Sequence, residues 1–393
     1  MNTGWYHQTY QTGEWDGFND SGIETFREEP LLNLARETIQ NAIDARLSNN
    51  APVTVYFGIE HVKPDTIPDF EQFIKTLRQC AKEKNNKENE KANGFFNNAI
   101  SLINKDKLTV LTIIDSNTTG IKGPCDSETA YHAFMKAKGL SYKESNVASG
   151  SYGIGKLAPY AVSELRTVFV STVYEDNGNF IQLTQGKTIL TSHKNDTETK
   201  SATGFWGAID GCLPLDGAPS IAPWILNAIS NDEIQQKQGT KLTVLSFDAV
   251  AHWQEILACS VVINFFGAIA CGNLIVYIGD KYILNVDSIE TFFNYDEVQN
   301  FVNNIAQTAI DPDAFKNAYC YYRALTIHPG SVINSQTLNL KHCQLNLVVG
   351  ESLPKKVCLL RNGMFITDTL RGLIRFSDYY LEQKVFVNFV DTC

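Results

Sequence analysis

The stretch Pro30–Ala45, PLLNLARETIQNAIDA, decides the fold expected for the first half of the chain. Its apolar residues recur at steps of three and four, which predicts an amphipathic helix with proline in its first turn. Glu37, Asn41 and Asp44 are spaced four and three apart, so this helix places them together, opposite the apolar face. A carboxylate one turn from a carboxamide can orient a water molecule and ligate Mg²⁺.

Two strands are predicted to follow the helix. Residues 53–59 alternate between apolar and polar, as in a half-buried strand, and residues 108–114 are strongly apolar and end on Asp115. A turn rich in Thr, Gly and Pro follows, up to Pro124. A carboxylate at such a strand end can accept a hydrogen bond from the exocyclic amine of adenine, or it can simply cap its turn.

A glycine-rich loop, Gly150-Ser151-Tyr152-Gly153-Ile154-Gly155-Lys156, precedes a predicted helix over residues 156–165. Glycines allow close backbone approach, and a helix N-terminus with a lysine suits phosphate groups. The loop nearly matches the P-loop pattern G-x-x-x-x-G-K. However, Leu157 stands where Ser or Thr should bind Mg²⁺, and residues 143–149 do not form a convincing strand.

The remaining chain is divided as follows. Residues 1–29 are predicted to form an aromatic arm that packs on another surface. Residues 62–107 are predicted to form a solvated insertion, because 82–93 are almost entirely Lys, Asn and Glu. A helix is expected at about 127–137, and strands at 166–174, 180–185, 187–192 and 240–247. A boundary near residue 248 separates residues 30–248 from residues 249–393, where a long apolar helix at about 251–269 comes first. A strand at 274–278, helices within 288–327 and strands near 341–349, 356–361 and 384–390 complete the expected elements.

Composition excludes several classes of protein. The net charge of −10 argues against a general electrostatic grip on nucleic acid, although a local basic patch remains open. No apolar run of membrane-spanning length and no secretion signal is recognised. The nine cysteines form no C-x-x-C pair, as expected for free thiols in a reducing cytoplasm.

The order of these motifs resembles that of the GHKL ATPase superfamily, which includes gyrase, the ninety-kilodalton heat-shock chaperones, histidine kinases and MutL. The resemblance rests on Glu37-x-x-x-Asn41-x-x-Asp44-Ala45, Asp115 with Gly120, the loop 150–156, and Gly239-Thr240. The flanking chain is most similar to the MutL- and MORC-related ATPases of bacterial defence and restriction neighbourhoods. One departure is the turn Asp115-Ser-Asn-Thr-Thr-Gly120, which stands in place of D-x-G-x-G.

The resemblance implies an α+β fold, in which a Bergerat-type ATP-binding α/β sandwich with helices on a mixed sheet precedes a smaller α/β transducer-like domain. It also implies ATP and Mg²⁺ as ligands, with Glu37 as general base, Asn41 as the Mg²⁺ ligand and Asp115 as the adenine anchor. The other residues assigned to the nucleotide are Asp44, Ala45, Asn117, Gly120, Gly150, Ser151, Tyr152, Gly153, Ile154, Gly155, Lys156 and Thr240.

In dimeric members of the superfamily, a lysine from the following domain reaches the γ-phosphate. Lys356 is the candidate here, with Lys355 and Arg361 as alternatives. The resemblance implies a homodimer that forms on ATP binding, when a lid over residues 139–150 closes and the arm crosses to the partner. The client stays open between DNA, a phage component and a protein effector, and no membrane partner is expected.

Three other functions fit these motifs less well. A sensor that binds ATP without hydrolysing it has no need of a base such as Glu37. A histidine kinase should carry an acceptor histidine on a helix ahead of the first motif, where only His7 occurs. A P-loop NTPase lacks its hydroxyl residue at Leu157.

Overall fold

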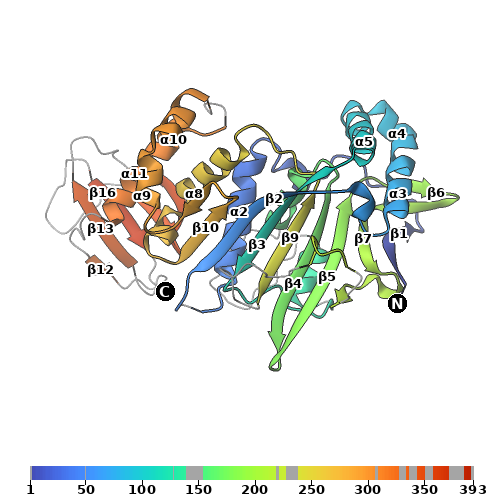
Figure 1. Cartoon of the computed structure of the whole chain (residues 1–393), viewed down its shortest axis with the longest axis horizontal. Helices are drawn as coiled ribbons and strands as arrows, with labels where there is room; N and C mark the ends of the chain where they lie inside the picture. Colours follow the sequence, from blue (N-terminus) through green and yellow to red (C-terminus); the bar gives the residue numbers. More distant parts are fainter. Residues whose placement is uncertain are drawn as a thin grey trace. The chain divides into compact units, whose positions relative to one another are not determined.

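The chain forms two compact units, seen here in a computed structural model (Figure 1). The first unit takes residues 1–48 and 55–251, and the second takes residues 49–54 and 252–393. The structure describes residues 2–48, 50–126, 128–138, 154–217, 221–226, 238–305, 309–326, 333–335, 343–349, 357–370 and 385–390.

A large sheet forms the centre of the first unit, with the strand order β1-β7-β5-β4-β9-β3-β2. These strands are β1 (Thr3–Tyr10), β2 (Val53–Val62), β3 (Leu108–Ser116), β4 (Thr167–Asp176), β5 (Asn179–Ile189), β7 (Glu198–Ala208) and β9 (Gly239–Leu245). Two short strands extend it, because β6 (His193–Asn195) pairs with β7 and β8 (Leu215–Asp216) pairs with β5. In the part of this order that runs β1-β7-β5-β4-β9-β3, every strand is antiparallel to its neighbours.

Helix α2 (Pro30–Asp44) confirms the predicted amphipathic pattern. Proline opens it, and the backbone N–H of Ala45 donates to Asn41 O at its C-terminal end. Its buried face is Leu31, Leu34, Ala35, Thr38, Ile39 and Ala42. Two other apolar residues of this stretch, Leu32 and Ile43, are half-buried. Glu37, Asn41 and Asp44 lie outside the buried stripe, as expected.

The predicted solvated insertion is wrong, because residues 62–107 form a helical layer on the sheet. It contains η1 (Pro64–Thr66), α3 (Phe70–Lys82), α4 (Lys84–Glu88) and α5 (Glu90–Ile103). Helices α3 and α5 contribute to one core cluster through Phe73, Ile74, Leu77, Cys80, Ala92, Phe96, Ala99, Leu102 and Ile103. The polar run at 82–93 dominates the composition but occupies only the link between two amphipathic helices. Even there, buried Asn86 donates to Cys80 O and Thr191 Oγ1, both at 2.8 Å.

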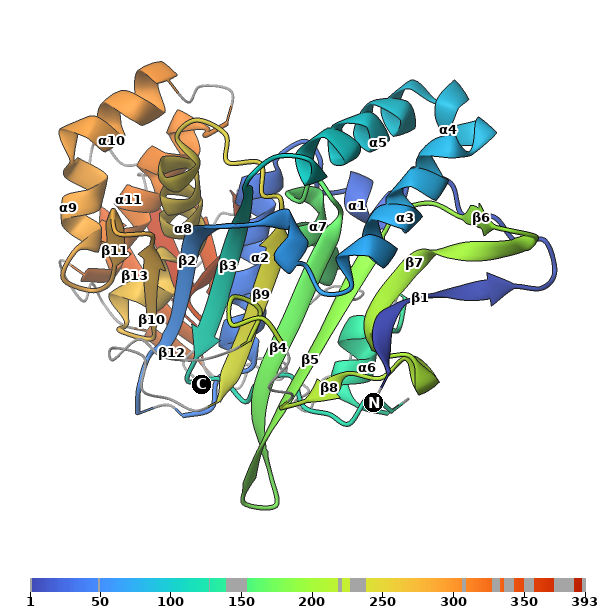
Figure 2. The same ribbon diagram turned by 45° about the vertical axis from the view of Figure 1, so that its right-hand side comes forward.

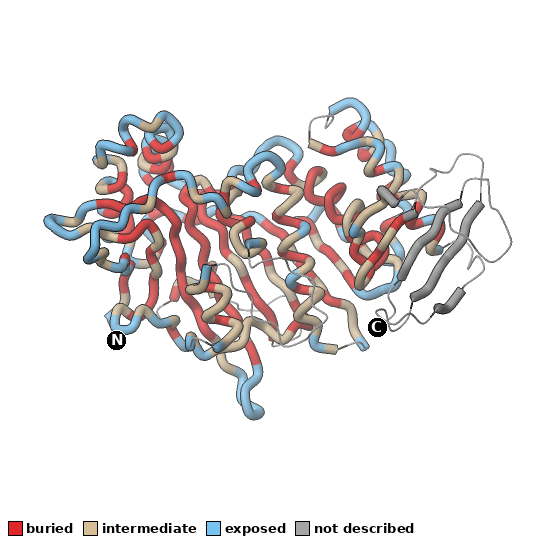
Figure 3. The backbone as a smooth tube through the Cα atoms, turned by 180° about the vertical axis from the view of Figure 1, so that it is seen from behind, coloured by how far each residue is buried: buried red, intermediate tan, exposed pale blue. Residues whose placement is uncertain are grey.

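Both faces of this sheet are therefore covered. Phe169 and Leu245 belong to the cluster with α3 and α5, whereas their chain neighbours Val168 and Val244 point to the opposite face and are equally buried. Helices α2 and α7 (Ala158–Ala161) lie on that opposite face (Figure 2). The middle of the sheet is accordingly buried along its strands (Figure 3).

The N-terminal arm is a strand of its own unit. Strand β1 pairs antiparallel with β7, and Trp5 packs its ring 5.1 Å from Phe73 and 5.8 Å from Phe169. Phe18 is buried too. The arm therefore packs its most buried residues on its own unit, whereas Tyr6 and Trp15 are exposed. The sequence predicts an arm here because the aromatic residues show no helix or strand period, and the strand that pairs with them, β7, lies about 200 residues further along the chain.

Other elements differ in length from those predicted. The helix expected at 127–137 is α6 (Ala130–Met135), and the one expected at 156–165 is a 3-10 turn, η2 (Gly155–Leu157), followed by the short α7. Strand β5 is continuous where two strands were expected. Strand β7 was missed, because its residues Thr199–Ser201 and Thr203–Gly204 are mostly polar or small.

The second unit surrounds the apolar helix α8 (Trp253–Ala270). It also contains the hairpin β10 (Leu274–Ile278) and β11 (Tyr282–Leu284), and the helical segments α9 (Ile289–Asn294), α10 (Asp296–Asn300), η4 (Phe301–Ile305) and α11 (Pro312–Thr326). A second sheet has the order β12-β13-β16-β14-β15. Its strands are β12 (Ile333–Ser335), β13 (Cys343–Val349), β14 (Val357–Arg361), β15 (Met364–Leu370) and β16 (Val385–Val390), and β14 and β16 are parallel. The predicted α+β class is confirmed as helices packed with sheets.

Helix α8 is an apolar run of membrane-spanning length, which the sequence analysis did not predict. It is 18 residues long with a mean hydropathy of 1.5, enough by length and composition to cross a membrane. It is 72% buried inside the protein, which is consistent with the core helix of a soluble protein. Its apolar residues extend all round the helix because it is enclosed by its own unit.

Candidate functional site

Glu37 of α2 lies directly against the backbone of Gly155. A Cβ atom added to Gly155 would stand 2.9 Å from Glu37 Cδ and closer still to Oε2, so only glycine fits there without displacing the carboxylate. Within the described part of the chain, the Glu37 carboxylate receives no hydrogen bond or ion pair. Partial burial raises its pKa, against an opposing effect of Arg36. This carboxylate is uncommitted and more basic than usual.

Asp115 is anchored through one of its two carboxylate oxygens. The Thr118 hydroxyl and the backbone N–H of Thr240, the latter at 3.0 Å, both donate to Oδ1. The described residues give Oδ2 no hydrogen bond. Desolvation raises the pKa of Asp115 to about 6, although both hydrogen bonds oppose the shift. At neutral pH the group is therefore mostly a carboxylate with one oxygen left to accept a hydrogen bond.

The surroundings of Asp115 are drawn together by close backbone approach. Gly239 has φ +153°, and a Cβ there would lie 3.2 Å from Asp115 C and nearer to its carbonyl oxygen. Gly120, with φ +66°, lies beside the Val173 carbonyl. Thr172 joins these two glycines, since its Oγ1 accepts from Ile121 N at 2.7 Å and donates to Gly239 O at 3.4 Å.

The end of α2 is bonded to the turn that follows β3. Thr119 N donates to Ala45 O at 2.8 Å, Leu47 N to Asn117 O at 2.9 Å, and Asn117 Nδ2 to Ser48 O at 3.0 Å. Helix α2 therefore carries Glu37 near its middle, and Ala45, eight residues later at its C-terminal end, contacts the turn that follows Asp115. At 1.5 Å per residue, the two ends of the site are about 12 Å apart along the helix axis.

Asn41 and Asp44 lie between these ends. Asn41 is exposed and Asp44 is half-buried. Among the described residues there is no group of three His, Cys, Asp or Glu side chains that could hold a metal ion. A single exposed carboxamide suits Mg²⁺, which keeps several waters and takes further ligands from a phosphate substrate rather than from a protein cage.

Lys156 is directed at helix α6 in this structure. Its Nζ donates to Ala133 O at 2.5 Å and Ala137 O at 2.6 Å, and burial lowers its pKa. The neighbouring Ile154 is exposed. Of the described residues of the glycine-rich loop, 154–156, Gly155 is the one that contacts Glu37.

Some predicted residues lie elsewhere. Gly150, Ser151, Tyr152, Gly153 and the expected lid at 139–150 lie outside the described residues, as do Lys355 and Lys356. Arg361 ends strand β14 in the second unit.

Sequence reasoning missed Thr118 and Thr172, which hold Asp115 and the two glycines in place. Threonines in a turn and in the middle of a strand carry no local signal of that role. Thr118 is only three residues from its partner Asp115, whereas Thr172 is 67 residues from Gly239 and 51 from Ile121, so the role of Thr172 follows only from the tertiary structure.

No protein-family model matches the chain, and a comparison with curated proteins found no significant match.

Proposed function

We propose that the chain binds and hydrolyses ATP in the site between Glu37 and Asp115, as a molecular switch of the GHKL type. The observation that carries the proposal is a pair of carboxylate groups, Glu37 in the middle of α2 and Asp115 in the strand whose turn bonds to the end of α2, each with an oxygen that receives no hydrogen bond from a described residue. Oδ1 of Asp115 is fixed by Thr118 and Thr240, whereas Oδ2 receives no hydrogen bond from the described residues, and Glu37 lies against Gly155 without a hydrogen bond or ion pair to any of them. One end suits an adenine amine and the other a reacting water.

In the proposed reaction, Glu37 accepts a proton from a water molecule while the oxygen of that water bonds to the γ-phosphorus. The bond from phosphorus to the β,γ-bridging oxygen breaks, so the products are ADP and phosphate. The raised pKa of Glu37 favours this role, because a base works best when its pKa approaches the working pH. Asn41 would hold Mg²⁺, which supplies charge neutralisation for the phosphates when it is bound.

The direct test is Glu37→Ala, with Glu37→Gln as the conservative companion. Both variants should keep ATP binding but lose turnover by about 10²–10⁴-fold, since the base acts on water and not on bound nucleotide. Phosphate release measures turnover and calorimetry with a non-hydrolysable analogue measures binding. Turnover close to that of the wild-type chain would remove Glu37 from the role.

The alternative is a sensor that binds ATP without hydrolysing it. It shares the Asp115 end of the site and differs only at Glu37. Wild-type chain that binds the analogue but releases no phosphate above the Glu37→Ala background would establish the sensor instead.

We also propose that the chain dimerises when it binds nucleotide, but without an N-terminal arm that is free to cross to the partner. Because β1 pairs with β7 and Trp5 is in the core, deleting residues 1–18 would damage the fold and cannot serve as a clean test. Light scattering with and without a non-hydrolysable analogue and Mg²⁺ can: doubled mass on binding supports the switch, and unchanged mass for chain shown to bind the analogue leaves a monomeric ATPase.

A further inference from the structure

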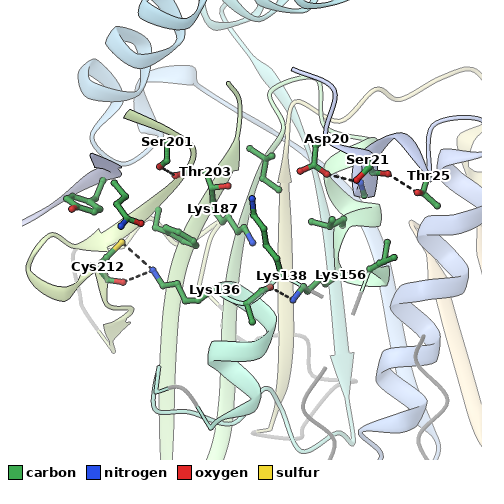
Figure 4. Close-up of a pocket in the computed structure, with 18 of the residues that line it drawn as sticks. Asp20, Ser21, Thr25, Lys136, Lys138, Lys156, Lys187, Ser201, Thr203 and Cys212 are labelled. Atoms are coloured by element: carbon green, nitrogen blue, oxygen red, sulfur yellow. Dashed lines mark hydrogen bonds between the residues drawn. The ribbon is translucent and has the colours of Figure 1, made fainter. Parts of the chain in front are cut away.

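The first unit contains a cavity of about 600 Å³ (Figure 4). Its floor is one face of three neighbouring strands, formed by Lys187 and Ile189 of β5, Thr203 and Phe205 of β7, and Tyr6 and Gln8 of β1. Lys187 is the cross-strand partner of Phe205, which is the partner of Tyr6, so these side chains share a face. The start of α1 (Ser21–Glu24) and residues 136–138 and 154–157 complete the wall.

Four lysines line this cavity: Lys136, Lys138, Lys156 and Lys187. Asp20 is the one acidic residue among the described residues of its lining. Figure 4 shows these side chains around the cavity. The lining therefore carries an excess of positive charge in a chain whose net charge is −10.

Capping of helix α6 explains part of the cluster. Lys187 Nζ donates to Met135 O at 2.8 Å and Lys156 Nζ to Ala133 O and Ala137 O, all at the C-terminal end of that helix. A helix C-terminus presents only about half a negative charge, however, and the effect falls off within one turn.

Lys136 has other partners, since its Nζ donates to Cys212 O at 2.8 Å and lies over the Phe205 ring, and Lys138 is exposed. These partners are neutral, so together with the helix terminus they leave a net positive charge at the cavity.

Among these four lysines, Lys187 is the one whose pKa is most lowered by burial and by the neighbouring positive charges. It is 6% exposed, and burial together with the charges of Lys156, Lys136 and Lys138 lowers its pKa to about 7, against a smaller opposing effect of Asp20. A buried ammonium surrounded by like charges is unfavourable unless an anion joins it. Its single acceptor among the described residues, Met135 O, leaves two of its three donors for such a partner.

We propose that this cavity binds a phosphate-bearing small molecule, whose phosphate group is held by Lys187 with Lys136, Lys138 and Lys156. Lysines act as point charges toward phosphate oxygens. The volume lies within the range of about 300–1,000 Å³ typical of small-molecule sites and exceeds what free phosphate needs. Phe205, Ile189 and Tyr6 supply apolar surface for the rest of the ligand. The lining includes neither Glu37 nor Asp115, although Ile154 and Lys156 belong to the loop assigned to the nucleotide, and the proposal does not rest on the ATPase activity.

The test uses inorganic phosphate and pyrophosphate as probes on the full chain, in EDTA without nucleotide and at constant ionic strength. Calorimetry and thermal unfolding should show saturable binding to the wild-type chain. Lys187→Met, close in size to lysine, and Lys138→Gln, at an exposed position, should each weaken binding by about tenfold or more, because each removes a charge-assisted contact. Lys105→Gln, an exposed lysine outside the cavity lining, is the matched control and should bind as the wild type does.

Proton uptake gives a second readout. Above pH 7, an anion beside Lys187 restores its charge, so the binding heat should depend on the ionisation enthalpy of the buffer. This dependence should vanish in Lys187→Met.

Three results would overturn the proposal: no saturable response of the wild type, binding unchanged by Lys187→Met, or equal weakening by Lys105→Gln. Lys187→Met should also leave binding of a non-hydrolysable ATP analogue unchanged. Loss of phosphate and analogue together, in a folded variant, would mean that one nucleotide site extends into this cavity. A chain that binds no ATP but still binds phosphate through Lys187 would refute the proposed function and retain this inference.

Discussion

Replacing Gly155 with alanine tests the contact on which the catalytic end of the site depends. The new Cβ would stand 2.9 Å from Glu37 Cδ, whereas carbon atoms in contact are normally about 3.5–4.0 Å apart. Relieving the Cδ contact alone requires a shift of about 0.6–1.1 Å, and the closer Oε2 atom requires a larger one, so the carboxylate must move by at least about 1 Å. It can do so because it ends a flexible side chain that no described residue holds by a hydrogen bond or ion pair. We expect the fold to survive and the position of the base to change.

The magnitude follows from the displacement. A catalytic group misplaced by about 1 Å loses about 10²-fold in rate, which is within the range of about 10²–10⁴-fold that a general base contributes. Gly155→Ala should thus lower kcat by about 10²-fold, equivalent to about 2.7 kcal/mol at 1.36 kcal/mol per tenfold. Affinity for ATP should change by less than about threefold, because the Asp115 end is untouched.

The assay is phosphate release at saturating ATP and Mg²⁺, with calorimetry for binding and thermal unfolding for integrity. The double variant Gly155→Ala/Glu37→Ala is the control. If alanine at Gly155 acts by displacing Glu37, the double variant should be no slower than Glu37→Ala alone. Wild-type turnover in Gly155→Ala, or losses that multiply in the double variant, would refute the reasoning.

Three further outcomes are expected. The affinity for an adenine nucleotide should fall as pH drops through about 6, because protonated Asp115 no longer accepts from the adenine amine. Asp115→Asn should bind more weakly by about 1–3 kcal/mol and lose that pH step, so an equal step in calorimetry of both proteins would exclude the assignment. The folded pKa of Lys187 lies below its ordinary value of 10.5, so stability is fully present above pH 10.5 and is lost as pH falls to about 7. Denaturant unfolding without phosphate should show Lys187→Met gaining on the wild type over that window, and parallel pH profiles would contradict it. Trp5→Ala should lower the free energy of unfolding by about 3–5 kcal/mol, because the ring is 3% exposed and its Nε1 donates to Pro68 O. Trp15→Ala, at a side chain that is 36% exposed, should change it little. Similar effects of the two substitutions in denaturant unfolding would place β1 outside the core.

The sequence predicted the parts of the site that depend on local periodicity. A period of 3.6 placed Glu37, Asn41 and Asp44 away from the buried face of α2, and an apolar run ending in an acid located Asp115 at the end of β3. These patterns hold because the side-chain direction along one helix or strand follows from its own backbone geometry. The nucleotide roles of these residues remain predictions.

Tertiary structure alone decided which distant segments meet. The contact of Gly155 with Glu37, the bond from Thr240 to Asp115 and the gathering of Lys187 with Lys136 join residues far apart in the chain. The polar composition of residues 82–93 concealed the helical layer around it, and the pairing of β1 with β7 has no local signature. Such contacts depend on which surfaces the whole sheet leaves to be covered, and a window of neighbouring residues does not contain that information.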